Sequence, residues 1–352
     1  MNKSVKQGRF ELLDLCRGIA SLIVVGIHTF RPNMQDFWPV VDFFFVLSGF
    51  VIAPMYLADL NARNVIKSRL IRLWPTIIYT LFFGFALQTV IAFKDRYFTS
   101  NMEITTFPSI IQILSSLFFL QVFFPSLTTF DGPLWSTSVE LIVNFALIVL
   151  MLKHKIRVLF CVIFIGEVIY YLGLRFDSIN SDLSGPISNA TGLARGFMGI
   201  SLGILLRSQF SYLKLLKNIF VRLILLFISF YILIELVKNL NFFSGFFNFI
   251  LCGYICIFFA LCKNPRNRLI LRLCGLSRKY SFGIFAIHEA TLPLADLLFK
   301  ISWFNSLDHW HQNSLLFVSK LFLSYLALQV YFKFFEKILE NSTRNFISNL
   351  LD

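Results

Sequence analysis

Long apolar stretches, separated by short polar segments, follow one another along the whole chain. A helix needs about 20 apolar residues to cross a bilayer, and in hydrocarbon only helices or closed barrels satisfy their own backbone groups. These stretches are too long and too uniformly apolar for barrel strands. The pattern therefore predicts an all-α protein, a polytopic membrane bundle with about ten transmembrane helices. The predicted spans are 12–30, 38–57, 74–93, 134–152, 157–174, 190–206, 222–238, 242–262, 280–299 and 314–335.

One further apolar segment, 109–124, determines the direction of every later span. If it crosses the membrane, each later loop changes side. The positive-inside rule resolves the choice, because Lys and Arg in short loops collect on the cytoplasmic face. When 109–124 is treated as re-entrant or interfacial, most of the 32 lysines and arginines fall on one side. We therefore expect both termini to be cytoplasmic.

Composition supports the membrane interpretation and excludes several other classes. Only 14% of the residues are charged, against about 25% in ordinary soluble domains. The net charge of +13 does not indicate nucleic-acid binding, because the basic residues form short clusters between apolar runs. The six cysteines include no Cys-x-x-Cys pair, so we expect neither disulfides nor a metal site. With no repeat and no soluble stretch of domain size, residues 1–352 are predicted to form a single transmembrane domain.

The first predicted span carries three ionisable side chains, Asp14, Arg17 and His28. Such groups cost about 2.5 kcal/mol or more at mid-membrane, so each needs a partner or a role. Arg17 and His28 lie on nearly the same helix face, about 16 Å apart along the axis. Two interpretations stay open: a functional face with a cation at one end and an imidazole at the other, or an Asp14–Arg17 pair with a histidine at the interface.

Two more polar sites lie near the second and third spans. Asp42 begins the second span at a depth similar to that of His28, where a carboxylate orients an imidazole and raises its basicity. An interfacial carboxylate at the start of a helix is the alternative. Arg69 and Arg72 precede the third span, and their guanidinium groups suit phosphate oxygens. Positive-inside anchoring explains them equally well.

Polar residues also open the fourth span and lie within the ninth. Trp135, Ser138 and Glu140 form a polar cluster at the predicted outer end of the fourth span. Glu140 is a candidate for holding an acceptor hydroxyl, and pairing with a structural arginine such as Arg195 is its alternative. His288, beside a glutamate, is either a relay element or a satisfied interhelical contact.

Taken together and in this order, these segments resemble the acyltransferase-3 family of bacterial membrane-bound O-acyltransferases. The resemblance spans residues 12 to 290. Cys16 stands where the family often has leucine, and Leu141 where it often has a second acid. The motifs that carry it are Asp14, Arg17-Gly18-Ile19-Ala20 and His28, then Asp42 through Phe50, Arg69 with Arg72 and Pro75, Leu134 through Glu140, and Ser281 through His288.

The resemblance implies an O-acyltransferase of the bacterial cytoplasmic (inner) membrane. Its expected donor is acyl-CoA, in particular acetyl-CoA, and its expected acceptor is a saccharide or glycolipid on the outer side. Under this hypothesis Arg69 and Arg72 bind the coenzyme A phosphates and Arg17 holds the thioester. His28 with Asp42 deprotonates the acceptor hydroxyl or relays the acyl group. The further candidates for the same cavity are Asp14, Trp135, Ser138, Glu140 and His288.

A secondary transporter or flippase of a glycan or lipid-linked substrate is the alternative hypothesis. In such a protein the intramembrane charges line a substrate path, and interrupted spans recur at corresponding positions of two halves. No such pair is found here, and the charged motifs crowd into residues 14–140. The distribution favours the enzyme.

Overall fold

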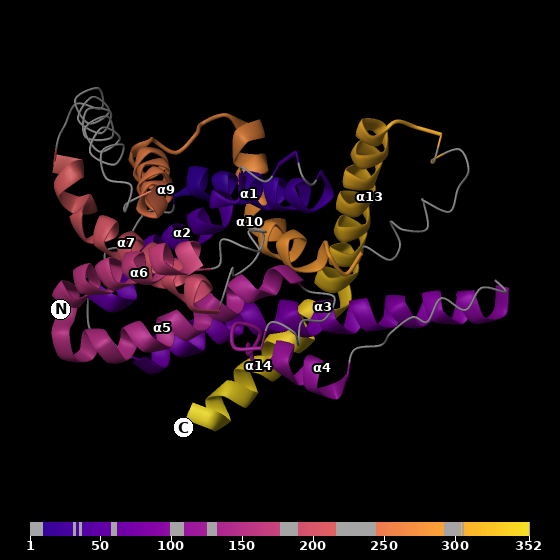
Figure 1. Cartoon of the computed structure of the whole chain (residues 1–352), viewed down its shortest axis with the longest axis horizontal. Coiled ribbons are helices and arrows are strands. Elements are labelled where there is room, and N and C mark those ends of the chain that lie inside the picture. Colours follow the sequence, from indigo (N-terminus) through magenta and orange to yellow (C-terminus); the bar gives the residue numbers. More distant parts are fainter. Residues whose placement is uncertain are drawn as a thin grey trace.

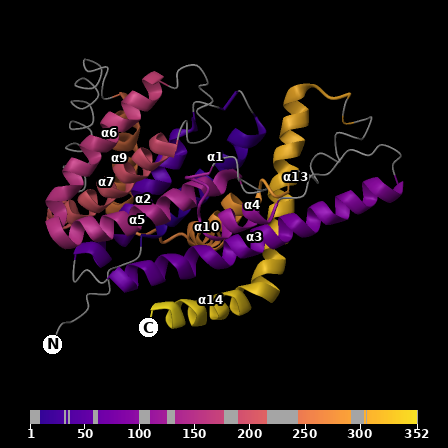
Figure 2. The same ribbon diagram turned by 60° about the horizontal axis from the view of Figure 1, so that its bottom comes forward.

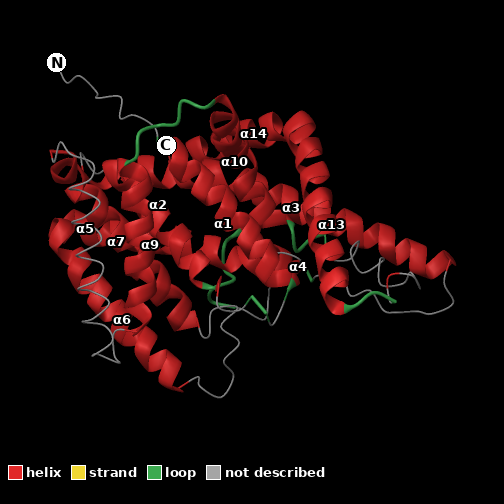
Figure 3. Cartoon of the chain, turned by 90° about the horizontal axis from the view of Figure 1, so that it is seen from above, coloured by secondary structure: helices red, strands yellow, loops and turns green. Residues whose placement is uncertain are grey.

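The computed structural model describes residues 10–30, 33–34, 37–57, 62–98, 109–124, 132–176, 189–215, 244–291, 304 and 306–351. All regular secondary structure in these ranges is helical (Figure 3). The elements are α1 (Glu11–Thr29), α2 (Pro39–Leu57), α3 (Ala62–Phe98), α4 (Ile110–Leu117), η3 (Gly132–Leu134), α5 (Trp135–His154), η4 (Lys155–Arg157), α6 (Val158–Phe176), α7 (Asn189–Leu215), α9 (Ser244–Leu261), α10 (Arg268–Ile287), α13 (His309–Val330), η6 (Tyr331–Phe335) and α14 (Glu336–Leu351).

The all-α membrane fold predicted from the apolar pattern is confirmed. In the described part of the chain, five helices are long and apolar enough to cross a membrane, and two shorter helices are also apolar. Large apolar side chains stay exposed on several of them, among them Phe82, Phe160 and Val318. Such exposure is unfavourable in water but suits contact with lipid. The five long segments are Glu11–Thr29, Pro39–Leu57, Ala62–Val90, Gly132–Met151 and His309–Asn349.

Each predicted span that the structure describes contains a helix, but α10 ends at Ile287 and is followed by turns over 288–291, and two helices begin earlier than expected. The third span, predicted from 74, belongs to α3, which begins at Ala62, and α10 begins at Arg268 instead of 280. In both cases the helix continues through basic residues that hydropathy assigns to a loop. Asn267 caps α10, its side chain accepting a hydrogen bond from the Leu269 amide. The predicted span 222–238 and most of 288–299 lie outside the described residues.

The segment 109–124 contains the short helix α4 followed by a non-helical stretch. Eight residues of α-helix extend only about 12 Å, against a hydrocarbon core of about 30 Å. Ser109 and Gln112 form a capping box that starts the helix. Phe119 takes a positive φ of 59° beyond its end. This short helix agrees with the prediction of a re-entrant or interfacial segment.

One half of the molecule is built from α2, α5, α6, α7 and α9, while α3 runs past them to the other side, where α13 crosses it (Figure 1). The crossing is fixed by a hydrogen bond of 2.6 Å from the Tyr79 hydroxyl to the Ala327 carbonyl. A π-helical turn, η6, separates α13 from α14. The chain bends there, and α14 lies along α3 (Figure 2), where the Lys67 ammonium donates to Ser348 at 2.9 Å.

Helices α2 and α7 approach each other backbone to backbone. A Cβ atom added at Gly49 would lie 2.1 Å from the Ile200 carbonyl oxygen, and one at Gly203 would lie 2.1 Å from the Val46 carbonyl oxygen. Small residues permit such close helix contacts in membranes. The contact holds α2, which carries Asp42 and Ser48, against α7, which carries Arg195.

Replacing Gly49 by valine should therefore destabilise the protein strongly, because the added side chain meets rigid backbone. We expect thermal unfolding of the detergent-solubilised protein to shift down by several degrees, with a loss of monodisperse material. Gly275→Val in α10 is the matched control, since no atom lies within 4 Å of a Cβ placed at Gly275. Equal unfolding temperatures for the two variants would contradict this account of the packing.

Candidate active site

The Arg17 end of α1 is tied to α10. The Arg17 Nε donates to the Ser281 Oγ at 2.9 Å, and its Nη2 donates to the Arg278 carbonyl at 3.3 Å. The same Nη2 lies 3.4 Å from the Asp14 carboxylate one turn earlier. The Asp14–Arg17 pair considered in the sequence is therefore present. Gly18 lets α10 come close, because a Cβ there would meet the side chain of Ser277.

Glu140 lies at the centre of a second polar junction, which joins α2, α3 and α5. Its carboxylate accepts from the Arg69 Nη1 at 2.7 Å and from the Ser48 hydroxyl at 2.6 Å. Arg69 also donates to the Ser48 carbonyl at 3.2 Å. Only 4% of the Arg69 side chain is exposed.

This junction corrects one expectation about Arg69 and one about Glu140. Arg69, which was expected to bind coenzyme A phosphates, is instead a buried residue of α3 that neutralises Glu140. Glu140 in turn pairs with Arg69 and not with Arg195. Arg72, one turn further along α3, faces open space instead and lines two cavities.

Asp42 is also engaged elsewhere than predicted. Its carboxylate accepts from the Arg195 Nε at 2.8 Å, and both side chains are almost fully buried. The Arg195 guanidinium also lies over the Trp135 ring, 5.6 Å from its centroid. Because α7 supplies a cation at this depth, Asp42 joins α2 to α7, and the expected pairing of His28 with Asp42 is wrong.

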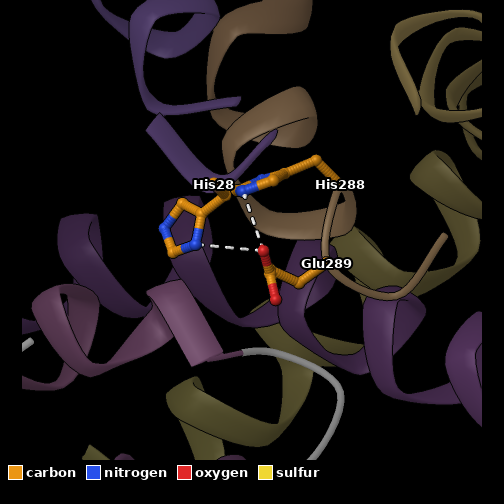
Figure 4. A group of neighbouring side chains, drawn as sticks. All are labelled: His28, His288 and Glu289. Carbon is orange, nitrogen blue, oxygen red and sulfur yellow. Dashed lines mark ion pairs between the residues drawn. The ribbon is translucent and has the colours of Figure 1, made fainter. Parts of the chain in front are cut away.

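His28 instead meets a carboxylate from the end of α10 (Figure 4). The His28 Nδ1 lies 3.1 Å from the Glu289 Oε1, and the His288 Nε2 lies 3.8 Å from the same oxygen. The two imidazole rings have centroids 5.2 Å apart. Trp38 makes an edge contact with His28 at 5.6 Å. We call His28, His288 and Glu289 the histidine cluster.

Two cavities lie toward the other end of α1 and share Arg17, Arg72 and Phe282. The first, of about 350 Å³, reaches in to Ser48 and Glu140. The second, of about 550 Å³, lies between α3, α10 and α14. Its charged lining residues are Arg17, Arg72, Arg278, Lys279, Glu336, Glu340 and Arg344.

The remaining predicted site residues divide between these cavities and the packing. Asp14 lines the first cavity. Ser138 does not line it but donates a hydrogen bond to the Phe119 carbonyl, which holds the turn after α4. Ser136 and Thr137 line the cavity in its place. Trp135 packs under Arg195 and against Phe45.

Sequence reasoning missed the cations of α10 and α14 as cavity residues. In the sequence, Arg278, Lys279 and Arg344 counted only among the lysines and arginines that set the direction of the spans. The signal that could have identified Arg278 and Lys279 is their helical context. The basic run before 280 continues the helix of the ninth span, so its side chains point in fixed directions. Glu289 was noted only as a neighbour of His288.

The family model for the acyltransferase domain matches residues 10–331. The chain belongs to the acyltransferase-3 family. A curated relative, "Protein 2 in picA locus" of Rhizobium radiobacter, is 37% identical over 81 residues, which are 21% of this chain. The chain covers 42% of that protein's length. No solved structure matches this chain.

The Arg69–Glu140 junction predicts that Arg69→Ala impairs folding before it impairs donor use. Removing one partner of a buried ion pair leaves an uncompensated charge and costs about 3 to 5 kcal/mol. We expect a large drop in the unfolding temperature measured by scanning fluorimetry. Arg63→Ala on the exposed face of the same helix is the control and should change stability by less than about 0.5 kcal/mol. Wild-type stability of Arg69→Ala would rule out a structural role for this arginine.

Proposed function

We propose that this protein is a membrane acyltransferase that moves an acyl group, in particular acetyl, from cytoplasmic acyl-CoA to a hydroxyl of a saccharide or glycolipid on the outer side of the bacterial inner membrane. The observation that carries the proposal is the arrangement along α1. One end of this helix borders the cation-lined cavities, and the histidine cluster lies at the other end, about 16 Å away along the axis.

The second cavity suits the phosphate groups of coenzyme A. Five of its seven charged lining residues are cations, drawn from α1, α3, α10 and α14. Guanidinium groups bind phosphate through paired, charge-assisted hydrogen bonds. The apolar walls of the first cavity, including Phe44, Phe282 and Phe285, suit the acyl-bearing arm of the donor. In this proposal Arg17 and Arg72, which line both cavities, bind the donor, and Arg69 positions Glu140.

His28 is proposed to act on the acceptor. When its Nδ1–H donates to Glu289, its Nε2 carries the lone pair, as a base or nucleophile requires. As a base, Nε2 takes the hydroxyl proton while the oxygen attacks the thioester carbonyl. The carbon–sulfur bond then breaks, and the proton passes to the departing coenzyme A thiolate. As a relay, the same nitrogen attacks the thioester carbonyl, and the carbon–sulfur bond breaks to release the coenzyme A thiolate. The acceptor hydroxyl then attacks the acyl carbon, the carbon–nitrogen bond breaks, and the hydroxyl proton passes to the thiolate.

The charge distribution supports the direction of transfer. Four of the five cations of the second cavity belong to the basic clusters that the positive-inside rule assigns to the cytoplasmic face, namely Arg72, Arg278, Lys279 and Arg344. Acyl-CoA is a cytoplasmic donor, so it meets the cavity without crossing the membrane. The histidine cluster then faces the outer leaflet, and both termini are cytoplasmic in this orientation.

Substitution of Arg72 should weaken donor binding with little effect on folding. We expect Arg72→Ala to raise the dissociation constant for acetyl-CoA about tenfold or more, since a charge-assisted hydrogen bond contributes about 1.5 to 3 kcal/mol. Arg72→Lys should restore part of the loss, because lysine keeps the charge but not the paired geometry. Isothermal titration with acetyl-CoA measures both.

The matched control for Arg72 is Arg268→Ala, an exposed arginine at the start of α10 that does not line either cavity. Arg344→Gln should weaken binding as Arg72→Ala does, since α14 closes the second cavity. Wild-type affinity in both the Arg72 and the Arg344 variants would exclude this cavity as the donor site.

His28→Ala should abolish acylation while leaving normal amounts of membrane-inserted protein. General bases contribute about 10²- to 10⁴-fold to rate, and Glu289→Gln should cost less because the glutamine oxygen still accepts from Nδ1. Mass spectrometry of surface glycans from cells expressing each variant measures the product. His311→Ala, on the exposed start of α13, is the control. Acylation near the wild-type level in His28→Ala would exclude His28 from the reaction.

A further inference from the structure

The histidine cluster presents three potential metal ligands from two segments far apart in the sequence. The ligand atoms of His28, His288 and Glu289 all lie within 4.8 Å of one another. Both imidazoles approach the same carboxylate, as Figure 4 shows. His288 is fully buried, whereas 13% of the His28 side chain and 17% of the Glu289 side chain remain exposed. A small ion can therefore reach the cluster from the side of His28 and Glu289.

The backbone around His288 determines which of its nitrogens is available. Its Nδ1 lies 2.9 Å from the Phe285 carbonyl oxygen and 3.2 Å from the Ile284 carbonyl oxygen. Carbonyl oxygens only accept, so Nδ1 carries the hydrogen and Nε2 carries the lone pair. Metal-binding histidines are typically held in this way, with the second ring N–H donated to a carbonyl or carboxylate.

The Nε2 of His288 has no hydrogen-bond partner among the described residues although it is buried. It points at the Glu289 oxygen 3.8 Å away, which is also an acceptor. Two acceptor atoms facing each other at this distance gain nothing from the contact. An electron-pair acceptor such as a metal ion, placed between them, satisfies both atoms. The same ion can accept a third electron pair from the Nδ1 of His28.

We propose that His28, His288 and Glu289 bind a divalent transition-metal ion, best matched by Zn²⁺. Two histidines and a glutamate form a known zinc ligand set that leaves the fourth tetrahedral position open. Metal–ligand bonds of about 2.0 to 2.2 Å place tetrahedral ligands about 3.4 Å apart. The separations of 3.1 Å and 3.8 Å in the cluster bracket that value.

The ion is an inhibitor of the transfer, and this part of the inference rests on the proposed function. In the proposed reaction, the hydrogen bond from the Nδ1 of His28 to Glu289 leaves the lone pair on Nε2, which acts as the base. A metal ion bound to Nδ1 displaces this hydrogen bond. The hydrogen then resides on Nε2, and the imidazole can no longer take the hydroxyl proton.

Lys320 limits the affinity of the site. It is buried in α13 and close enough to act electrostatically on both Glu289 and His288. Its positive charge opposes a cation at the cluster. Removing that charge without changing the ligands should therefore tighten metal binding, whereas removing a ligand should weaken it.

Equilibrium dialysis of the purified full-length protein against Zn²⁺, with metal quantified by mass spectrometry, tests the site. We expect one Zn²⁺ per chain above any cysteine-bound background, at least tenfold weaker binding in His288→Ala and Glu289→Gln, and tighter binding in Lys320→Met. His311→Ala controls for exposed histidines. Glu289→Gln keeps the side-chain shape, so it serves where His288→Ala fails to fold. Binding unchanged in both ligand variants would overturn the site.

The inhibition is measured separately from the binding, by following acylation in membranes as Zn²⁺ is raised. Half-maximal loss of transfer should occur at the Zn²⁺ concentration that half-fills the site. Full occupancy with undiminished transfer would overturn the inhibitory role. If the protein binds Zn²⁺ but transfers no acyl group even without the ion, the proposed function fails while the metal site stands.

Discussion

The buried ion pair between Arg69 and Glu140 is the interaction on which the proposed donor site of this protein depends. Hydrocarbon makes an isolated charge costly, so each member of the pair requires the other. Through Ser48 the pair also holds α2, and thus three helices meet at one carboxylate. This junction forms the inner limit of the first cavity, where the acyl-bearing arm of the donor is proposed to lie. Losing it would open the cavity wall and not merely remove one contact.

A similar constraint applies at the other end of α1. Asp42 is neutralised by Arg195 and is therefore unavailable to His28, and Glu289 takes its place. These three carboxylates therefore differ in what they contact: Glu140 and Asp42 join helices, whereas Glu289 contacts an imidazole. Helix α1 connects the two polar regions because its residues 17 and 28 share a face. Close packing with α10 keeps that face turned toward both.

The apolar pattern was sufficient to predict the fold class and most spans, because hydrocarbon requires each span to satisfy its backbone locally. It could not locate the start of α3 or α10. Basic residues continue those helices beyond the apolar core, and hydropathy alone cannot distinguish such a helix from a loop. The sequence identified polar residues of these junctions but, apart from the Asp14–Arg17 pair, it did not identify their partners. Asp42 and His28 share a predicted depth, yet depth does not specify rotation about the helix axis or which helix lies alongside. The contribution of α14 to the second cavity depends on the π-helical bend at Tyr331–Phe335, which no sequence pattern indicated.

The proposed transfer across the membrane is tested most directly by measuring from which face of the membrane the protein uses acetyl-CoA. Acetyl-CoA does not cross bilayers, so labelled acetyl-CoA can be supplied to one face at a time, in inside-out and right-side-out vesicles from cells that make the acceptor. We expect labelled saccharide when acetyl-CoA reaches the cytoplasmic face, with the label located on the opposite side and protected from externally added hydrolase in inside-out vesicles. Labelling of equal extent from acetyl-CoA added outside sealed right-side-out vesicles would contradict a donor site on the cytoplasmic side and an acceptor site at the histidine cluster.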